Sequence, residues 1–212
     1  ATNYKVSIIL TQIFSFRFEV AIKEALSENA KIEMLEEAKA MIRVSKHDHI
    51  VNIQGVCEHN DSVYLLLEFC SLGPIDDFLR KHSTLNNQTS IKDLIHWSSQ
   101  VADGMGFLAD KNIYHGDLAA RNILLNEHLV AKVADFGLSR RLYEDFSINS
   151  IFKENQTSMK IPTKWLALEA LAHGQIIPGR SDVWSFGVVM WEIFSLGLTP
   201  YRPRKIRSIL SH

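Results

Sequence analysis

Hydrophobic and polar positions divide the chain into a strand-rich first third and a helix-rich remainder. Residues 5–23 are rich in β-branched and aromatic types with partial alternation, which predicts strand. Residues 28–45 place apolar side chains at helical spacing among Glu and Lys, which predicts an amphipathic helix. Two apolar runs, Ile50–Val56 and Val63–Phe69, flank a polar segment over His59–Ser62 and predict a strand–turn–strand unit.

The pattern turns helical after Gly73-Pro74. The expected features there are a short helix from Asp76, a polar loop over His82–Gln88, a helix over Leu94–Leu108 and a helix over Ser181–Phe194. The last of these is so apolar that we expect it to be buried, with Ser181 or Asp182 near its N-cap. Two lobes joined near residues 71–74 are therefore expected, and a cleft between lobes is a common place for a ligand.

Composition and charge narrow the classes of function. The 212 residues are 46% hydrophobic, which suits a globular protein with a real core. The 23 basic and 24 acidic residues nearly balance and form no charged tail, so nucleic acid and membrane are not expected partners. No run reaches the ~20 apolar residues of a membrane span. Cys57 and Cys70 lack metal-ligand spacing and favour reduced thiols in the cytosol.

Two charged residues in the first third are candidates for a buried ion pair. Lys23 ends the segment Val20-Ala21-Ile22-Lys23, and Glu37 follows fourteen residues later on the predicted helix. A buried lysine needs a carboxylate partner, which a helix packed on the sheet could supply. Each residue also has a plainer explanation, as an exposed strand lysine and as part of a solvated helix face.

Two short motifs at a specific spacing carry the strongest signal. Residues 115–122 read His-Gly-Asp-Leu-Ala-Ala-Arg-Asn, and Asp135-Phe136-Gly137 begins thirteen residues after Asn122. Between them, Ile123–Leu125 and Val130–Ala134 predict a hairpin. This hairpin would bring together a loop carboxylate, a carboxamide and a second carboxylate, which are groups that can form a metal–phosphate site.

The two motifs resemble the catalytic loop and the metal-binding motif of protein kinases, and the resemblance extends from about Val20 to Tyr201. It implies an α+β, two-lobed protein kinase fold within one domain, with a small antiparallel-sheet lobe carrying one helix (1–70) and a larger, mainly helical lobe (71–212). It also implies ATP and Mg²⁺ as cofactors. The roles it implies are Asp117 as catalytic base, Asn122 and Asp135 as Mg²⁺ ligands, and Lys23, paired with Glu37, on the ATP phosphates.

Other positions match the family's supporting residues. For adenine binding they are the backbone of Glu68 and Cys70, with Leu67 as gatekeeper and Ala21 and Leu124 around the base. For structural support they are His115, Phe136, Gly137, Glu169 and Asp182, the last bracing the catalytic-loop backbone. Met41, Ile53, His115 and Phe136 resemble the apolar spine that links the lobes. Plain core packing explains the apolar members of these sets at least as well.

Three segments resemble the tyrosine-specific kinases in particular. Leu118–Arg121 has the tyrosine-kinase form, in which Arg121 supplies the positive charge that a lysine of the loop provides in serine/threonine kinases. Ile161–Trp165 resembles the platform beneath the longer tyrosine side chain, and Asp182–Gly187 resembles the supporting helix. The resemblance therefore implies protein substrates with tyrosine acceptors, and it places Arg121 among the catalytic residues.

Some features depart from the family pattern. No glycine precedes Gly55, so residues 1–19 cannot supply the usual glycine-rich loop over the phosphates. Gly116 replaces an arginine that commonly pairs with a phosphotyrosine of the activation segment, and Tyr143 is the only tyrosine between Asp135 and Glu169. We therefore expect that this segment is not switched by that contact.

The ends of the chain also depart from the pattern. The chain begins with alanine and stops at His212, so we expect a kinase domain incomplete at both ends, without its last helices and with apolar surface exposed on residues 183–194. Leu168 stands where the family usually has proline, just before Glu169, which normally pairs with an arginine near the end of the domain.

The leading interpretation is an ATP- and Mg²⁺-dependent protein tyrosine kinase acting in signalling. The alternative is a pseudokinase, a scaffold with the same fold that binds partners without catalysis. Lys23, Glu37, Asp117, Asn122 and Asp135 favour catalysis, whereas Gly116 and the missing glycines favour the scaffold. A cytoplasmic location is expected, either as a free kinase or as the intracellular part of a membrane receptor; Leu138–Tyr143 has a receptor-like character. The oligomeric state stays open.

Overall fold

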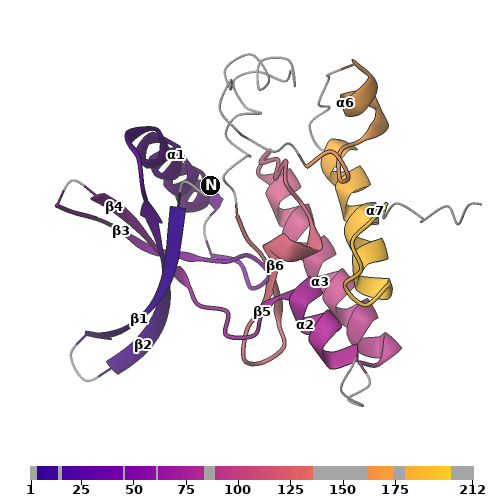
Figure 1. Ribbon diagram of the computed structural model, residues 1–212, viewed down its shortest axis with the longest axis horizontal. Helices are drawn as coiled ribbons and strands as arrows, with labels where there is room; N and C mark the ends of the chain where they lie inside the picture. Colours follow the sequence, from indigo (N-terminus) through magenta and orange to yellow (C-terminus); the bar gives the residue numbers. More distant parts are fainter. Residues whose placement is uncertain are drawn as a thin grey trace, which may run out of the picture.

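Two lobes of different composition meet along a small central sheet (Figure 1). The computed structural model describes residues 4–13, 16–44, 46–60, 62–83, 89–135, 162–173 and 180–201. One lobe contains a four-stranded antiparallel sheet with helix α1 packed against it. The other contains helices α2, α3, α6 and α7 and the three-stranded sheet β5-β6-β7. The α+β, two-lobed arrangement predicted from the sequence is confirmed.

The sheet of the first lobe has the strand order β1-β2-β4-β3. Its strands in chain order are β1 (Tyr4–Ile13), β2 (Phe16–Ala25), β3 (Ile53–His59) and β4 (Ser62–Glu68). The strand prediction for residues 5–23 is correct in type, but two antiparallel strands cover this region, with Ile13 opposite Phe16. Strand β2 lies between β1 and β4 and therefore holds Lys23 in the middle of the sheet.

Helix α1 (Glu28–Val44) covers this sheet and confirms the predicted amphipathic helix. Ser27 caps its N-terminus, because the Ser27 hydroxyl accepts a hydrogen bond from the Ala30 amide at 3.2 Å. One face is buried against the strands and consists of Ala30, Met34, Glu37, Ala38, Met41 and Val44. Glu37 therefore lies on the buried face of the helix and not on a solvated one.

The second lobe combines helices with a short hairpin. Its elements are β5 (Gly73–Pro74), α2 (Ile75–Ser83), α3 (Ile91–Asp110), a 3₁₀ turn η1 (Ala120–Asn122), β6 (Ile123–Leu125), β7 (Ala131–Val133), α6 (Leu168–His173) and α7 (Arg180–Phe194). A capping box starts α3: the Ser90 hydroxyl accepts from the Asp93 amide at 3.3 Å, and the Asp93 carboxylate accepts from the Ser90 amide at 2.9 Å. The predicted hairpin after Asn122 is present as β6–β7.

The segment between α1 and β3 joins the two lobes. Ile50 forms a parallel bridge with Val133 of β7, which explains why β3 begins later than the predicted Ile50. The Val51 amide donates to the Val133 carbonyl at 2.9 Å, and the Val133 amide donates to the His49 carbonyl at 2.9 Å. These backbone bonds attach the sheet lobe directly to the hairpin of the helical lobe.

Helix α7 begins at Arg180, so Ser181 and Asp182 lie in its first turn, near the N-terminus as predicted, and the Asp182 carboxylate accepts backbone amides from a distant segment. The predicted burial holds for one face only. Ile193 is fully buried, whereas Val183 is 70% exposed and Trp191 is 49% exposed.

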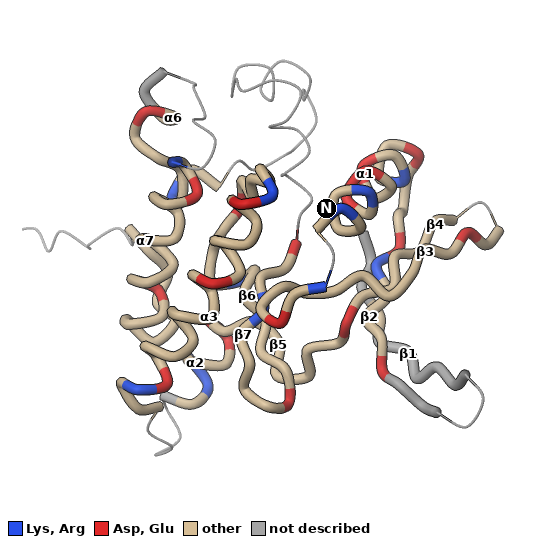
Figure 2. The backbone as a smooth tube through the Cα atoms, turned by 180° about the vertical axis from the view of Figure 1, so that it is seen from behind, with Lys and Arg blue, Asp and Glu red and all other residues tan. Residues whose placement is uncertain are grey.

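Charged residues of both signs are mixed over the described surface. Figure 2 shows Lys and Arg interspersed with Asp and Glu along α1, where Lys39 pairs with Glu36 at 2.6 Å. Exposed pairs of this kind contribute little to stability. Among the described helices, none combines the length and apolar character that a membrane crossing requires.

Two glycines on α3 test how closely the lobes pack. A Cβ added at Gly104 would lie 2.6 Å from the His49 carbonyl oxygen, whereas a Cβ at Gly106 would meet no atom within 4 Å. We expect Gly104→Ala to lower the free energy of unfolding by about 1–3 kcal/mol through overpacking. Gly106→Ala, as the matched control, should raise it by about 1 kcal/mol through helix propensity. Urea unfolding of both variants checks this, and equal shifts would contradict the close packing of α3 on His49.

Candidate active site

The segment 115–122 lies between α3 and the β6–β7 hairpin, and its backbone is held by a side chain of α7. The Asp182 carboxylate accepts the His115 amide at 2.8 Å and the Gly116 amide at 3.1 Å. His115 is fully buried, and its Nε2 lies 2.9 Å from the Ala134 carbonyl oxygen. Because Nε2–H donates there, Nδ1 accepts the hydrogen bond from the Asp117 amide, which lies 3.2 Å away. The Asp182 side chain of α7 and the backbone carbonyl of Ala134 thus fix the loop.

Asp117 lies between a cation and a carboxamide. Arg121 Nη2 donates to Asp117 Oδ1. The Asn122 side-chain nitrogen donates to the Asp117 carbonyl at 2.7 Å and to its Oδ2 at 3.0 Å. Burial raises the pKa of Asp117, although Arg121, His115 and Asn122 oppose the rise. A positioned carboxylate whose pKa is raised toward neutrality is suited to accept a proton.

The β6–β7 hairpin brings Asn122 and Asp135 to the same end of the lobe. The Ala134 amide donates to the Asn122 carbonyl at 2.8 Å, and Ile123 pairs with Val133. Asp135 has a left-handed φ of 63°, which is uncommon outside glycine and concentrates at functional sites.

The side-chain oxygens of Asn122 and Asp135 suit Mg²⁺ as a ligand pair. The Asn122 nitrogen is already engaged by Asp117, which leaves the carboxamide oxygen as the atom able to bind a cation. Mg²⁺ usually binds one or two carboxylates together with substrate phosphates. Among the described residues, no cluster of three or more His, Cys, Asp or Glu side chains could hold a metal alone.

A buried ion pair faces this hairpin from the sheet lobe. Lys23 Nζ lies 2.7 Å from Glu37 Oε2 and 3.5 Å from Asp135 Oδ1. Burial alone lowers the pKa of Lys23, but the two carboxylates outweigh it, and the net shift of this pKa is upward. Lys23 is therefore a fixed cation next to Asp135, as contact with phosphates would require.

The residues predicted around adenine lie on β2, on β4 with the segment after it, and on β6. Ala21 is opposite Leu67 in the sheet, and Leu67 and Leu124 pack against the same apolar cluster. The Glu68 amide donates to the Asn52 carbonyl at 2.9 Å, and the Cys70 carbonyl accepts the Gly73 amide at 3.1 Å. The Glu68 amide and the Cys70 carbonyl therefore each already have a backbone partner.

The side chain of Glu68 forms contacts that the sequence did not suggest. Its Oε1 lies 2.7 Å from Lys132 Nζ on β7, and its Oε2 accepts the Asn52 side-chain amide at 2.8 Å. Lys132 is buried. An alternating strand pattern does not reveal such a partner, because the two residues lie far apart in the chain and in different sheets.

Trp165 lies beneath Arg121 and is bound to α7 by its side chain and its backbone. The Arg121 guanidinium carbon is 4.3 Å from the centre of the indole ring. The Trp165 indole N–H donates to Glu192 Oε2 at 2.8 Å, and the Ser185 hydroxyl donates to the Trp165 carbonyl at 2.7 Å. The sequence analysis missed Glu192; its only signal was a carboxylate within an apolar helix.

The remaining predicted residues lie in the core, on an exposed hollow or outside the described part. Met41 is buried and Ile53 packs against the same cluster. Phe136, Gly137 and Tyr143 lie outside the described residues.

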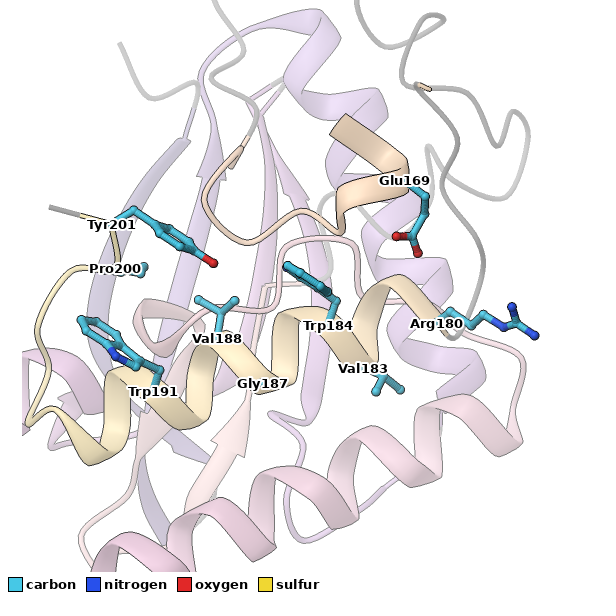
Figure 3. A pocket seen from close by; sticks show the side chains of 9 residues that line it. All are labelled: Glu169, Arg180, Val183, Trp184, Gly187, Val188, Trp191, Pro200 and Tyr201. Atoms are coloured by element: carbon cyan, nitrogen blue, oxygen red, sulfur yellow. The ribbon is translucent and has the colours of Figure 1, made fainter. Parts of the chain in front are cut away.

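Glu169 lines an apolar hollow of about 680 Å³ on the exposed face of α7. Figure 3 shows Trp184, Val188, Trp191 and Tyr201 around it, with Glu169 and Arg180 toward one end. None of the residues predicted to bind ATP lines this hollow.

Gly116 occupies a backbone conformation that other residues adopt only with strain. Its φ is 76°, and a left-handed L-residue costs about 1–2 kcal/mol. We therefore expect Gly116→Ala to lower the free energy of unfolding by about this amount. Gly55→Ala serves as the control, since a Cβ there meets no atom within 4 Å. Chemical denaturation measures both, and an unchanged midpoint for Gly116→Ala would contradict the assigned backbone.

The two cysteines should differ sharply in reactivity. Cys57 is exposed, whereas Cys70 is buried and burial raises the pKa of its thiol to about 12. Because the thiolate is the reactive form, iodoacetamide near neutral pH should label Cys57 at least about tenfold faster than Cys70. Mass spectrometry of the native protein checks this. Equal labelling in denaturant is the control, and equal labelling of the native protein would contradict the burial of Cys70.

The sequence is similar to known proteins over most of its length. Residues 9–212 match the family model described as protein tyrosine and serine/threonine kinase. A fibroblast growth factor receptor of Halocynthia roretzi is 36% identical over 203 residues, which cover 85% of this chain and 26% of that protein. Fibroblast growth factor receptor 1 of Pleurodeles waltl is 36% identical over 192 residues, covering 85% of this chain and 23% of that protein.

The chain thus spans about a quarter of the length of these curated relatives. The family match includes the catalytic-loop segment, the β6–β7 hairpin and the Lys23–Glu37 pair. This chain therefore belongs to the protein tyrosine and serine/threonine kinase family.

Proposed function

We propose that this chain is a protein tyrosine kinase domain that transfers the γ-phosphoryl group of ATP to tyrosine hydroxyls of protein substrates. The observation that carries the proposal is the meeting of two groups from different lobes. Lys23 Nζ, paired with Glu37, lies 3.5 Å from Asp135 of the helical lobe. Phosphoryl transfer needs this kind of positioned charge more than covalent chemistry.

Each part of the site has a proposed role. Asp117 orients the acceptor hydroxyl and takes its proton, and Arg121 holds that carboxylate in place. Lys23 binds ATP phosphates, while Asn122 and Asp135 would hold Mg²⁺. When bound, Mg²⁺ would neutralise charge on the phosphate oxygens. Ala21, Leu67 and Leu124 would enclose adenine, with the Glu68 carbonyl and the Cys70 amide as its polar contacts.

The supporting residues and the lobes complete the proposal. His115 and Asp182 hold the catalytic loop, whereas roles for Phe136, Gly137, Glu169 and Tyr143 rest on the family resemblance. Residues 1–70 and 71–212 would form the two lobes of one kinase domain. Tyrosine specificity rests on Leu118–Arg121 and on Trp165.

The names of the relatives bear on location. Both are fibroblast growth factor receptors, so we propose that this segment acts in signalling as the intracellular part of a membrane receptor.

A pseudokinase scaffold is the second candidate, and specific observations favour it. No glycine precedes Gly55 to form a phosphate-covering loop, and Gly116 carries no cation for an activating phosphate. Such a scaffold would bind partners, with or without nucleotide, and would transfer no phosphate.

Replacing the proposed base separates the two candidates. We expect Asp117→Asn to lower kcat for a tyrosine peptide by about 10²–10⁴-fold, because the positioned base is lost. The same variant should keep the rise in Tm caused by ATP with Mg²⁺, because Lys23 is untouched. Radiolabelled phosphate transfer to matched tyrosine and serine peptides measures the first effect, and thermal unfolding measures the second.

Asp110→Asn, at the end of α3, is the control and should behave as the parent chain. A parent that transfers no phosphate and shows no nucleotide-dependent rise in Tm would leave only the scaffold. Transfer to serine in preference to tyrosine would contradict the proposed specificity.

A further inference from the structure

Glu192 is a buried carboxylate on α7 that the proposed mechanism does not use. Its side chain is 4% exposed although it belongs to an otherwise largely apolar helix. Burying a carboxylate is costly unless hydrogen bonds compensate for the lost water. The hydrogen-bond partners of Glu192 therefore indicate which role the buried carboxylate has.

Two segments far apart in the chain converge on one oxygen of Glu192. The Ala120 backbone amide donates to Oε2 at 2.9 Å, and the Trp165 indole N–H donates to the same atom at 2.8 Å. Ser185, two turns earlier on α7, donates to the Trp165 carbonyl at 2.7 Å. One face of α7 thus binds the tryptophan at its backbone and at its ring.

Both donors lie next to Arg121. Ala120 precedes it in the chain, and the Trp165 ring lies 4.3 Å beneath its guanidinium. Arg121 in turn donates to the Asp117 carboxylate. Glu192 is therefore linked to the proposed base along two routes, through the backbone of the catalytic loop and through a stacked ring.

We propose that Glu192 is a positioning residue, which joins the Trp165 platform to the catalytic loop and so orients Arg121 and Asp117 toward the acceptor tyrosine. This inference rests on the proposed tyrosine kinase function. Glu192 touches no reacting group itself and acts only through Trp165 and Ala120.

The surroundings of Glu192 indicate that its role depends on an oxygen that accepts hydrogen bonds more than on its negative charge. Burial raises the pKa of Glu192, while the Trp165 and Ala120 hydrogen bonds oppose that rise. Asp76 adds to the rise and Arg121 opposes it. Both donors meet one oxygen, so a glutamine with its carbonyl oxygen in that place could accept both hydrogen bonds.

The test compares Glu192→Leu with Glu192→Gln in the 212-residue chain. We expect Glu192→Leu to lower kcat for a tyrosine peptide about 10- to 100-fold, as misplacement of a catalytic group does, with an unchanged KM for ATP. Glu192→Gln should restore most of kcat. Val189→Ala, at a buried position of the same helix, is the control for lost stability. It should lower Tm while leaving the KM for ATP and the KM for the peptide near those of the parent.

Trp165 supplies a readout independent of turnover. Trp165→Phe keeps a ring beneath Arg121 but removes the indole N–H, and it identifies the Trp165 indole resonance in NMR spectra by its loss. That resonance should shift in Glu192→Leu and stay in place in Glu192→Gln. The double variant Glu192→Leu with Trp165→Phe should lower kcat by less than the product of the two single fold-changes. Both substitutions remove the same hydrogen bond, from the Trp165 indole to Glu192.

The outcomes separate the inference from the function on which it rests. A Glu192→Leu variant with the parent's kcat, or one that loses activity only in proportion to its Tm as Val189→Ala does, overturns the positioning role alone. Failure of Glu192→Gln to restore kcat also overturns it. A parent chain without tyrosine phosphorylation overturns the proposed function and the inference together, even where the indole resonance shifts as expected.

Discussion

The arrangement of the catalytic loop depends on two hydrogen bonds to the carboxylate of Asp182. This side chain accepts the amides of His115 and Gly116, which a loop without regular secondary structure would otherwise leave without partners in a largely buried position. Asp182 lies in the first turn of α7, a helix that packs Val189 and Ile193 into the core of the helical lobe. The loop is therefore held in place by a helix that is packed into the core of that lobe, and this contact also positions Asp117, Arg121 and Asn122.

Gly116 fits this arrangement for a simple steric reason. The amide that Asp182 binds belongs to a residue with φ near 76°, where a side chain would cause strain. An arginine at this position would combine that strain with a cation, whereas glycine relieves the strain and offers no charge to a phosphate. The geometry of Asp117 is thus compatible with Gly116, which leaves this position without a charge.

The sequence predicted best those features that depend on short-range spacing. Helical periodicity and the Val20–Lys23 segment indicated the Lys23–Glu37 pair, because a helix and its adjacent strand lie close in the chain. The hairpin that aligns Asn122 with Asp135 was equally local. Asp182 was linked to the loop only through family resemblance, because its carboxylate accepts amides of a backbone segment that is distant in the chain.

Contacts between residues far apart in the chain were not predictable in this way. The Glu192 carboxylate reaches Ala120 and Trp165 across many intervening residues, and Lys132 reaches Glu68 in the same manner. Hydrophobic periodicity assigns such residues to one face of a helix or strand, but it does not identify which distant segment packs against that face. A polar residue inside an apolar run is the one signal that a distant partner exists, because burial without a partner would be too costly.

The two halves of the site lie on different lobes, so their alignment depends on how the lobes are joined. The segment after α1 forms backbone hydrogen bonds with β7 through His49 and Val51. On its other side, the His49 carbonyl lies so close to Gly104 of α3 that a Cβ there would be 2.6 Å away. Close-packed contacts of this kind have few alternative arrangements. Since β7 leads directly to Asp135, this attachment fixes Asp135 relative to the lobe that carries Lys23, and the 3.5 Å contact between the two is a consequence of it.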